Sequence, residues 1–301
     1  MKQVEDLPDS GALYVHLGCL ARGKYPSIEY STLKNLRTLG FKPSTSSREV
    51  CCGGLLYLFG FSSFKSMTSF IGWNTWTAAE HSKIIASVCD TCYSAYLHVL
   101  KEIRENPDVK GEVEKALGKV GVKPVWDVKV YQVAEIYYRV KDRLLELQKK
   151  SLEGMKIAVH HGCHYAKAFP DEVLGKPENI RFLKELVESL GGEAVEYAEE
   201  NLCCGTCLSI SGYCDRKASV KTTEAKISSM REAGAELIVV TCPGCLVTFD
   251  EAPKELNPLP VLHVSELVGL ALGLDPAREL VLHDRRTKVR LPPLKVASKK
   301  G

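Results

Sequence analysis

The stretch Lys156-Ile-Ala-Val-His-His-Gly162 leads into Cys163, and Leu13-Tyr-Val-His-Leu-Gly18 leads into Cys19 in the same way. Each is a short apolar run that ends in glycine, a pattern typical of a buried strand followed by a tight turn. Three more pairs of segments match in the same order: 48–53 with 200–205, 84–92 with 237–245, and 130–136 with 261–267. One structural unit is therefore written twice along the chain.

Amphipathic segments lie between these matched strands. Apolar residues recur at helical spacing over 30–39, 178–190 and 218–233, and a charged helix is expected over 134–150. Strands that alternate with helices predict an α/β fold with two tandem similar domains, related by an internal pseudo-twofold repeat, each a parallel-type sheet with flanking helices. We expect domains over residues 1–150 and 151–284, and a basic flexible tail over 285–301.

Composition and charge restrict the classes of protein and partner. The chain has 301 residues, 45% of them hydrophobic, with a net charge of +3, so nucleic acid is not an expected partner. Acidic residues within Met1–Asp6 argue against an export signal, and apolar stretches such as Leu262–Leu274 are too short to cross a bilayer. We expect a cytoplasmic protein without a transmembrane segment. In a reducing compartment, its 12 cysteines indicate metal binding or thiol chemistry.

Ten cysteines form two matching sets of five. In the first half, 31 residues separate Cys19 from the Cys51-Cys52 pair, and 36 more precede a C-x-x-C motif. In the second half the corresponding gaps are 39 and 37 residues. A tetrahedral zinc ion suits this pattern poorly, because adjacent cysteines are strained as ligands of one small ion. Neighbouring irons of a cluster suit adjacent thiolates better. Gly53 and Gly205, directly after each pair, are expected to adopt positive φ and to direct N–H groups at sulfur.

This double Cys-Cys-Gly arrangement resembles the B subunit of heterodisulfide reductase and its cysteine-rich-domain relatives, over about residues 12 to 270. The resemblance implies two noncubane [4Fe-4S] clusters that together cleave a disulfide of the coenzyme M–coenzyme B type. It also implies the ligands of each cluster. The first set is Cys19, Cys51, Cys52, Cys89 and Cys92, and the second is Cys163, Cys203, Cys204, Cys242 and Cys245.

Reduction of a disulfide requires two electrons and two protons, whereas iron–sulfur clusters usually transfer one electron at a time. Two clusters that face one pocket between the halves would suit this reaction. His161 and His164 flank the strand-end cysteine of the second half and are our candidate catalytic proton donors.

The sequence has neither the motif of ordinary cubane clusters nor a G-x-G-x-x-G motif for flavin or nicotinamide, so electrons are expected from partner proteins. The resemblance implies a ferredoxin-like C subunit and a flavin-containing A subunit, or association with a membrane through partners. Two other functions stay open. They are membership of a heterodisulfide-reductase-like sulfur-oxidation complex, and electron transfer linked to quinone.

Several residues outside the two cysteine sets have more than one interpretation. Cys207 and Cys214 are buried structural residues, additional ligands, or redox-active thiols that accept sulfur. Lys167 is either solvated or placed to meet an anionic substrate. Asn74 and Glu80 are expected to be exposed or capping. The basic tail is either solvated or an arm that binds a partner.

Overall fold

The computed structural model describes residues 2–210 and 216–297 and contains two parallel sheets. In the first half, the strand order is β2-β1-β3-β4, with β1 (Gly11–His16), β2 (Phe41–Ser44), β3 (Ile84–Ser87) and β4 (Lys129–Gln132). In the second half, the order is β6-β5-β7-β8, with β5 (Lys156–His160), β6 (Glu193–Val195), β7 (Leu237–Val240) and β8 (Val261–His263). The identical order confirms the predicted α/β repeat.

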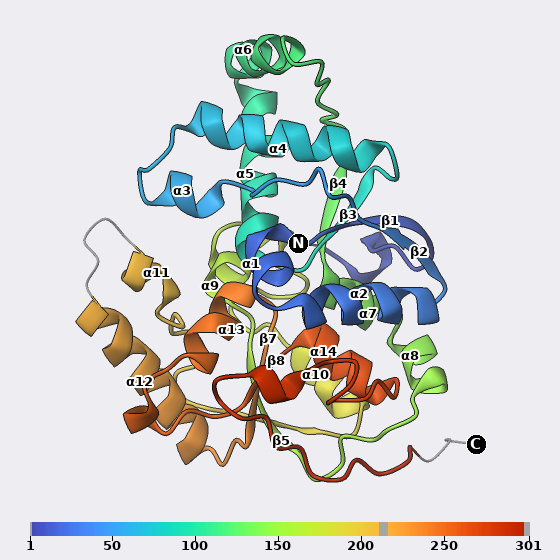
Figure 1. The fold of residues 1–301 in the computed structure, drawn as a ribbon, viewed down its shortest axis with the longest axis vertical. Helices are drawn as coiled ribbons and strands as arrows, with labels where there is room; N and C mark the ends of the chain where they lie inside the picture. Colours follow the sequence, from blue (N-terminus) through green and yellow to red (C-terminus); the bar gives the residue numbers. More distant parts are fainter. Residues whose placement is uncertain (1, 211–215, 298–301) are drawn as a thin grey trace.

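Helices cross between the strands and cover the sheets (Figure 1). The helices of the first half are α1 (Gly18–Gly23), α2 (Pro26–Thr38), α3 (Gly54–Leu58), α4 (Phe64–Ala79), α5 (Asp90–Glu105), α6 (Pro107–Gly118), α7 (Val133–Arg139) and α8 (Lys141–Leu147). Those of the second half are α9 (Cys163–Lys167), α10 (Phe182–Ser189), α11 (Thr206–Ile210), α12 (Arg216–Glu232), α13 (Pro243–Asp250) and α14 (Val264–Ala271). Short 3-10 turns occur at Val4–Asp6, Pro170–Glu172, Lys254–Leu256 and Leu282–Asp284.

The helix expected over 134–150 is divided into α7 and α8. Val140 lies between them with φ −103° and ψ 25°, outside the helical region. This break redirects the chain so that α8 joins α7 against α10 of the other half. The prediction of a single helix was therefore wrong. The charges continue along the whole segment, whereas the bend results from packing against the second half, which the sequence pattern does not indicate.

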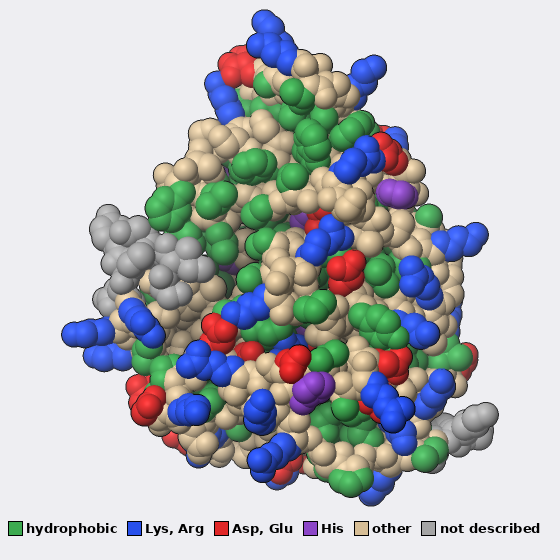
Figure 2. Space-filling view, viewed as in Figure 1, with side chains coloured by type: hydrophobic (Ala, Val, Ile, Leu, Met, Phe, Trp, Pro, Cys, Tyr) green, Lys and Arg blue, Asp and Glu red, His purple; other side chains and the backbone are tan. Residues whose placement is uncertain are grey.

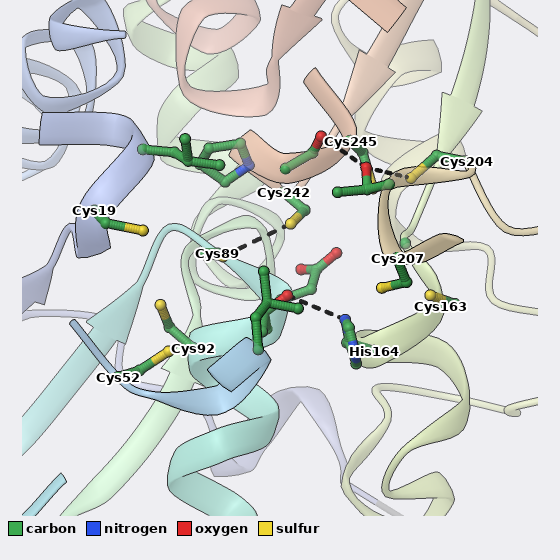
Figure 3. Close-up of a pocket in the computed structure, with 18 of the residues that line it drawn as sticks. Cys19, Cys52, Cys89, Cys92, Cys163, His164, Cys204, Cys207, Cys242 and Cys245 are labelled. Carbon is green, nitrogen blue, oxygen red and sulfur yellow. Dashed lines mark hydrogen bonds between the residues drawn. The ribbon is translucent and has the colours of Figure 1, made fainter. Parts of the chain in front are cut away.

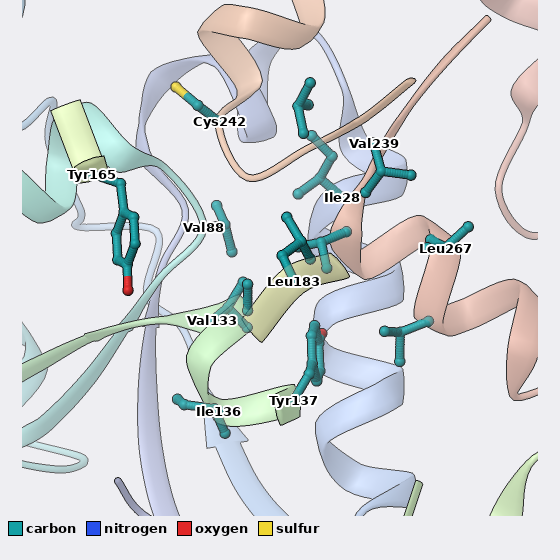
Figure 4. Packing of buried hydrophobic residues seen from close by; sticks show 14 of the residues in the cluster. Ile28, Val88, Val133, Ile136, Tyr137, Tyr165, Leu183, Val239, Cys242 and Leu267 are labelled. Atoms are coloured by element: carbon teal, nitrogen blue, oxygen red, sulfur yellow. The ribbon is translucent and has the colours of Figure 1, made fainter. Parts of the chain in front are cut away.

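The two halves pack against each other reciprocally. Helix α2 packs on α14, and α7 packs on α10. Since α2 is equivalent to α10 in the repeat, and α7 to α14, the two contacts are of the same kind. Figure 4 shows apolar side chains at this interface. Ile28, Val133 and Tyr137 of the first half and Leu183, Val239 and Leu267 of the second belong to one cluster of buried residues. Burial of such side chains contributes about 1.5–3 kcal/mol each. One hydrophobic core therefore continues through both halves and fixes their relative position.

Two buried carboxylates strengthen this interface. Glu135 closes the capping box at the start of α7, and Glu266 does the same for α14. Each accepts a hydroxyl hydrogen bond from the opposite half, from Tyr165 at 2.8 Å and from Ser27 at 2.6 Å. Each is also paired with a cation, Glu135 with Lys2 and Glu266 with Arg285. A buried carboxylate needs such partners.

The segment expected to be a flexible tail is held against the second half in its described part. Arg285 is 5% exposed in its pair with Glu266, and the Thr287 N–H donates to Asp250 at 3.0 Å. Further along, the Ala297 N–H donates to the carbonyl of Lys149 at 3.0 Å. Residues 285–297 thus pack back over the connection between the halves, and the prediction of flexibility overlooked the partner of Arg285. Residues 298–301 lie outside the described residues.

Charged side chains of both signs are interspersed on the face drawn in Figure 2, whereas exposed hydrophobic side chains gather around α3 and α4. The exposed residues after and within α3 are Leu56, Leu58 and Phe61. No helix in the described part of the chain is both long enough and apolar enough to span a membrane.

We expect Arg285→Met to lower the free energy of unfolding by about 3–5 kcal/mol, because it leaves the buried carboxylate of Glu266 without its cation. Urea unfolding of the anaerobically purified protein measures this loss. Arg286→Met is the matched control, since Arg286 is exposed and its replacement should change stability by less than about 0.5 kcal/mol. Equal stability of the two variants would contradict the structural role of Arg285.

Candidate metal centre

The cysteines of both halves lie at the carboxyl ends of parallel strands. Cys19 and Cys163 follow β1 and β5 in the first turns of α1 and α9. Cys89 and Cys242 follow β3 and β7 as the N-cap residues of α5 and α13. The carboxyl ends of parallel strands share one edge of a sheet, where such folds place their binding sites. The topology therefore gathers each set at one edge.

The two edges face each other across one cavity of about 280 Å³ (Figure 3). Apolar side chains line part of it, namely Leu20, Leu55 and Leu56. Nine of the ten predicted ligands also line it: Cys19, Cys51, Cys52, Cys89, Cys92, Cys163, Cys204, Cys242 and Cys245. The tenth, Cys203, does not line the cavity, but its Sγ is 4.0 Å from that of Cys163.

The two cysteine sets meet at the centre of the cavity. The Sγ atoms of Cys89 and Cys242, which are equivalent residues of the repeat, are 3.6 Å apart. Beside them, Asp90 of the first half accepts hydrogen bonds from the Thr241 hydroxyl at 2.8 Å and from the Gln132 amide at 3.1 Å. A Cβ atom at Gly162 would lie 2.2 Å from the Asp90 carboxylate, so glycine is required there. The two halves are thus in direct contact at the cysteines.

Backbone N–H groups point at the sulfur of each adjacent pair. Gly53 and Gly205 have φ values of 72° and 100°, which confirms the predicted positive φ. The N–H of Gly53 donates to Cys51 Sγ at 3.4 Å, and that of Gly205 donates to Cys203 Sγ at 3.3 Å. Such hydrogen bonds favour a negatively charged sulfur.

Hydrogen bonds between neighbouring thiols shift the cysteine pKa values in the same directions in both halves. A hydrogen bond from Cys19 lowers the pKa of the Cys51 thiol to about 2, and one from Cys163 lowers that of Cys203 to about 2. Hydrogen bonding to its neighbour raises the pKa of Cys52, and likewise of Cys204, to about 12. Ten thiols packed this closely cannot all ionise unless cations compensate their charge. The donor set therefore fits an iron–sulfur group, which soft thiolates select.

The two candidate histidines lie in different surroundings. His164 lines the cavity, and its Nδ1 is 3.0 Å from the Thr91 hydroxyl (Figure 3). His161 does not line the cavity but packs against the ring of Phe182, with the centroids 5.4 Å apart. Burial lowers the pKa of His161 to about 3, so its ring is neutral near pH 7. Of the two candidates, the fold therefore brings only His164 to the cysteine-lined cavity.

Two further histidines lie at the cysteines, His16 and His160, the last residues of β1 and β5, and sequence reasoning assigned neither of them a contact with the cysteine sets. His16 Nδ1 is 3.3 Å from the Glu49 carboxylate, which also accepts the N–H of Gly18 at 2.7 Å. Burial opposes ionisation of Glu49, but these contacts outweigh it and lower its pKa. His160 is buried against Cys204 and Cys245. The Val-His dipeptide that ends both strands was the available signal.

Two other residues hold the cysteine-pair loops, a role that sequence reasoning gave to neither of them. Asn74 is fully buried, and its amide exchanges two hydrogen bonds of 2.9 Å with the backbone of Val50, beside Cys51. The expectation that Asn74 is exposed or capping was therefore wrong. In the second half, the buried ammonium of Lys226 donates to the carbonyls of Glu199, Glu200 and Leu202 at 2.7–3.0 Å. Burial lowers the pKa of Lys226 to about 8.

The remaining predicted residues are less central. Cys207 lines the cavity beside Cys163, which favours the interpretations that give it chemistry over a purely structural role. Cys214 lies outside the described residues. Lys167 is exposed and donates to the carbonyl of Asn201 at 2.9 Å. Glu80 pairs with Arg48 at the surface.

Comparisons with known proteins agree with this geometry. A family model described as a cysteine-rich domain (CCG) matches residues 13–95 and 157–250. The chain is 30% identical over 276 residues to the B subunit of the ferredoxin:CoB-CoM heterodisulfide reductase of Methanosarcina mazei, covering 88% of this chain and 90% of that protein. It is 27% identical to the 8-methylmenaquinol:fumarate reductase membrane anchor subunit of Wolinella succinogenes, covering 66% and 70%.

Among solved structures, a hypothetical protein from Helicobacter pylori has the same fold, with a TM-score of 0.71 and 14% identity over 94% of this chain and 54% of that one. The two segments that match the cysteine-rich-domain model lie one in each half, and both halves bring cysteines to the same cavity. The repeat, its cysteines and the identity over nearly the whole length together show that the chain belongs to the family of heterodisulfide reductase B subunits, with its CCG cysteine-rich domain in two copies.

Proposed function

We propose that this chain is the catalytic iron–sulfur subunit of a heterodisulfide-reductase-like complex and reduces a disulfide of the coenzyme M–coenzyme B type. The observation that supports this most directly is the convergence of both cysteine sets on one cavity, with Cys89 and Cys242 in contact. A disulfide bound there would face both halves at once. The relative from Methanosarcina mazei carries this activity in its name.

The five cysteines of each half would hold one noncubane [4Fe-4S] cluster, with the N–H groups of Gly53 and Gly205 directed at the ligand sulfurs. When bound, each cluster would supply one electron, so that two electrons and two protons convert one disulfide into two thiols. The chain itself shapes the site. Leu20, Leu55 and Leu56 make part of the lining apolar, and an apolar lining would strengthen electrostatic interactions inside the cavity.

His164 would deliver a proton to a product thiolate. Its contact with the Thr91 hydroxyl engages Nδ1 and fixes the ring, which leaves Nε2 for the substrate. A positioned acid of this kind contributes about 10²–10⁴-fold to rate.

Partner subunits would supply the electrons. We propose a ferredoxin-like C subunit, fed by a flavin-containing A subunit, and association with a membrane only through such partners. The exposed apolar group of Leu56, Leu58 and Phe61 adjoins the cavity, which Leu56 also lines. Apolar surface of this kind suits contact with another protein.

Replacement of one buried ligand in either half tests whether both halves act together. We expect Cys52→Ser and Cys204→Ser each to reduce disulfide cleavage at least 100-fold, while the EPR signal of the unaltered half remains. The reason is that one remaining cluster cannot supply both electrons at one bond. Steady-state cleavage with a dye as electron donor measures this. Retention of half the activity in either variant would show that the halves act independently.

The variant His164→Asn should lower turnover about 10²-fold or more without loss of iron, because a proton donor is removed and no ligand is changed. Turnover and iron content are measured on the same preparation. His81→Asn is the control, since His81 is exposed and stacks on Tyr14 away from the cavity. Turnover in His164→Asn equal to that of the control would remove His164 from the mechanism.

A sulfur-oxidation complex is the second candidate, and Cys207 favours it because this thiol lines the cavity beside Cys163. Cys207→Ser separates the two functions. Disulfide reduction should be unchanged in this variant if the leading proposal holds. Two results together would favour the alternative: the unaltered protein oxidises a sulfane-sulfur donor without detectable disulfide reduction, and Cys207→Ser loses that oxidation.

Electron transfer linked to quinone is the third candidate, because the relative from Wolinella succinogenes is named as a subunit of an 8-methylmenaquinol:fumarate reductase.

A further inference from the structure

His160 is a buried imidazole whose hydrogen-bonding capacity is unused. It is 2% exposed, and neither ring nitrogen has a hydrogen-bond partner among the described residues. The ring is held edge-on against Phe249, with centroids 5.6 Å apart and planes at 87°. A buried polar group without a hydrogen-bond partner is unfavourable, so these nitrogens are suited to a partner that binds beside them.

The ring faces two cysteines of the second set. Ligand atoms of His160, Cys204 and Cys245 all lie within 4.8 Å of one another, and all three residues are buried. Two thiolates and one imidazole form a donor set that suits iron. Imidazole replaces thiolate as an iron ligand in one known class of iron–sulfur centre, where it raises the reduction potential.

The equivalent histidine of the first half, His16, has different hydrogen-bond partners. Nδ1 of His16 is anchored by the Glu49 carboxylate and by the Tyr96 hydroxyl, each at 3.3 Å. The residue at the position of Glu49 in the second half is Asn201. The described residues include no carboxylate paired with His160. Nε2 of His16 also has no hydrogen-bond partner among the described residues, but of the two histidines only His160 has a ring nitrogen within 4.8 Å of two cysteine sulfurs there.

We propose that His160 is a nitrogen ligand of the iron–sulfur group in the second half, beside Cys204 and Cys245, whereas His16 stays uncoordinated. This inference rests on the proposed function, which places such a group in each half. The two halves then differ in ligand set although their cysteines match. The second half would then carry a neutral imidazole in addition to its five thiolates, and this extra ligand would give the two groups different reduction potentials.

Pulsed EPR tests the nitrogen ligand without any substitution. Anaerobically prepared protein labelled with ¹⁵N-histidine, oxidised stepwise, should show the strong coupling of a directly bound nitrogen. His160→Gln should lose this coupling, and the matched variant His16→Gln should keep it. As a second readout, His160→Cys should lower the midpoint potential of the second half, because thiolate replaces imidazole.

The outcomes separate this inference from the proposed function. Iron and sulfide present without strong ¹⁵N coupling would overturn the nitrogen ligand and leave the two-cluster proposal intact. Strong coupling that disappears in His16→Gln and persists in His160→Gln would also overturn it. Absence of iron and sulfide from the unaltered protein would overturn both proposals.

Discussion

The contact between Cys89 and Cys242 is the constraint on which the rest of the structure depends. These equivalent residues cap the helices that follow β3 and β7, and their sulfurs lie 3.6 Å apart. The contact requires the carboxyl edges of the two parallel sheets to face each other. The reciprocal packing of α2 on α14 and of α7 on α10 holds that arrangement. A single cavity lined by both cysteine sets is the consequence.

The two halves match in their thiols but differ in what supports them. The cysteine-pair loop of the first half is held by the neutral amide of Asn74, and that of the second half by the buried ammonium of Lys226. Glu49 anchors His16, whereas His160 has no carboxylate partner in the described part of the chain. Charge near a metal group tunes its potential. Duplication of one unit has thus produced two chemically distinct sites, which suits a reaction in which two electrons pass singly.

The repeat and the cysteine spacing predict the sheets, the positive φ of Gly53 and the sets that meet at the cavity, because these features depend on local patterns. Contacts between distant segments explain what sequence reasoning missed. In the sequence, Asn74 is a polar residue of a helix, and its hydrogen bond to Val50 appears only in the fold. Arg285 likewise belongs to a basic segment in the sequence, and its pairing with Glu266 appears only in the fold. The environments of His161 and His164 likewise depend on neighbours in α10 and α5.

The central claim is that each half holds one four-iron cluster at its five cysteines. Iron and acid-labile sulfide per chain, measured on anaerobically expressed protein together with EPR during stepwise oxidation, test it most directly. The account predicts about eight irons and about eight sulfides per chain, with two distinguishable signals. About four of each would contradict it, because one of the two matched cysteine sets would then hold no cluster and could not supply the second electron.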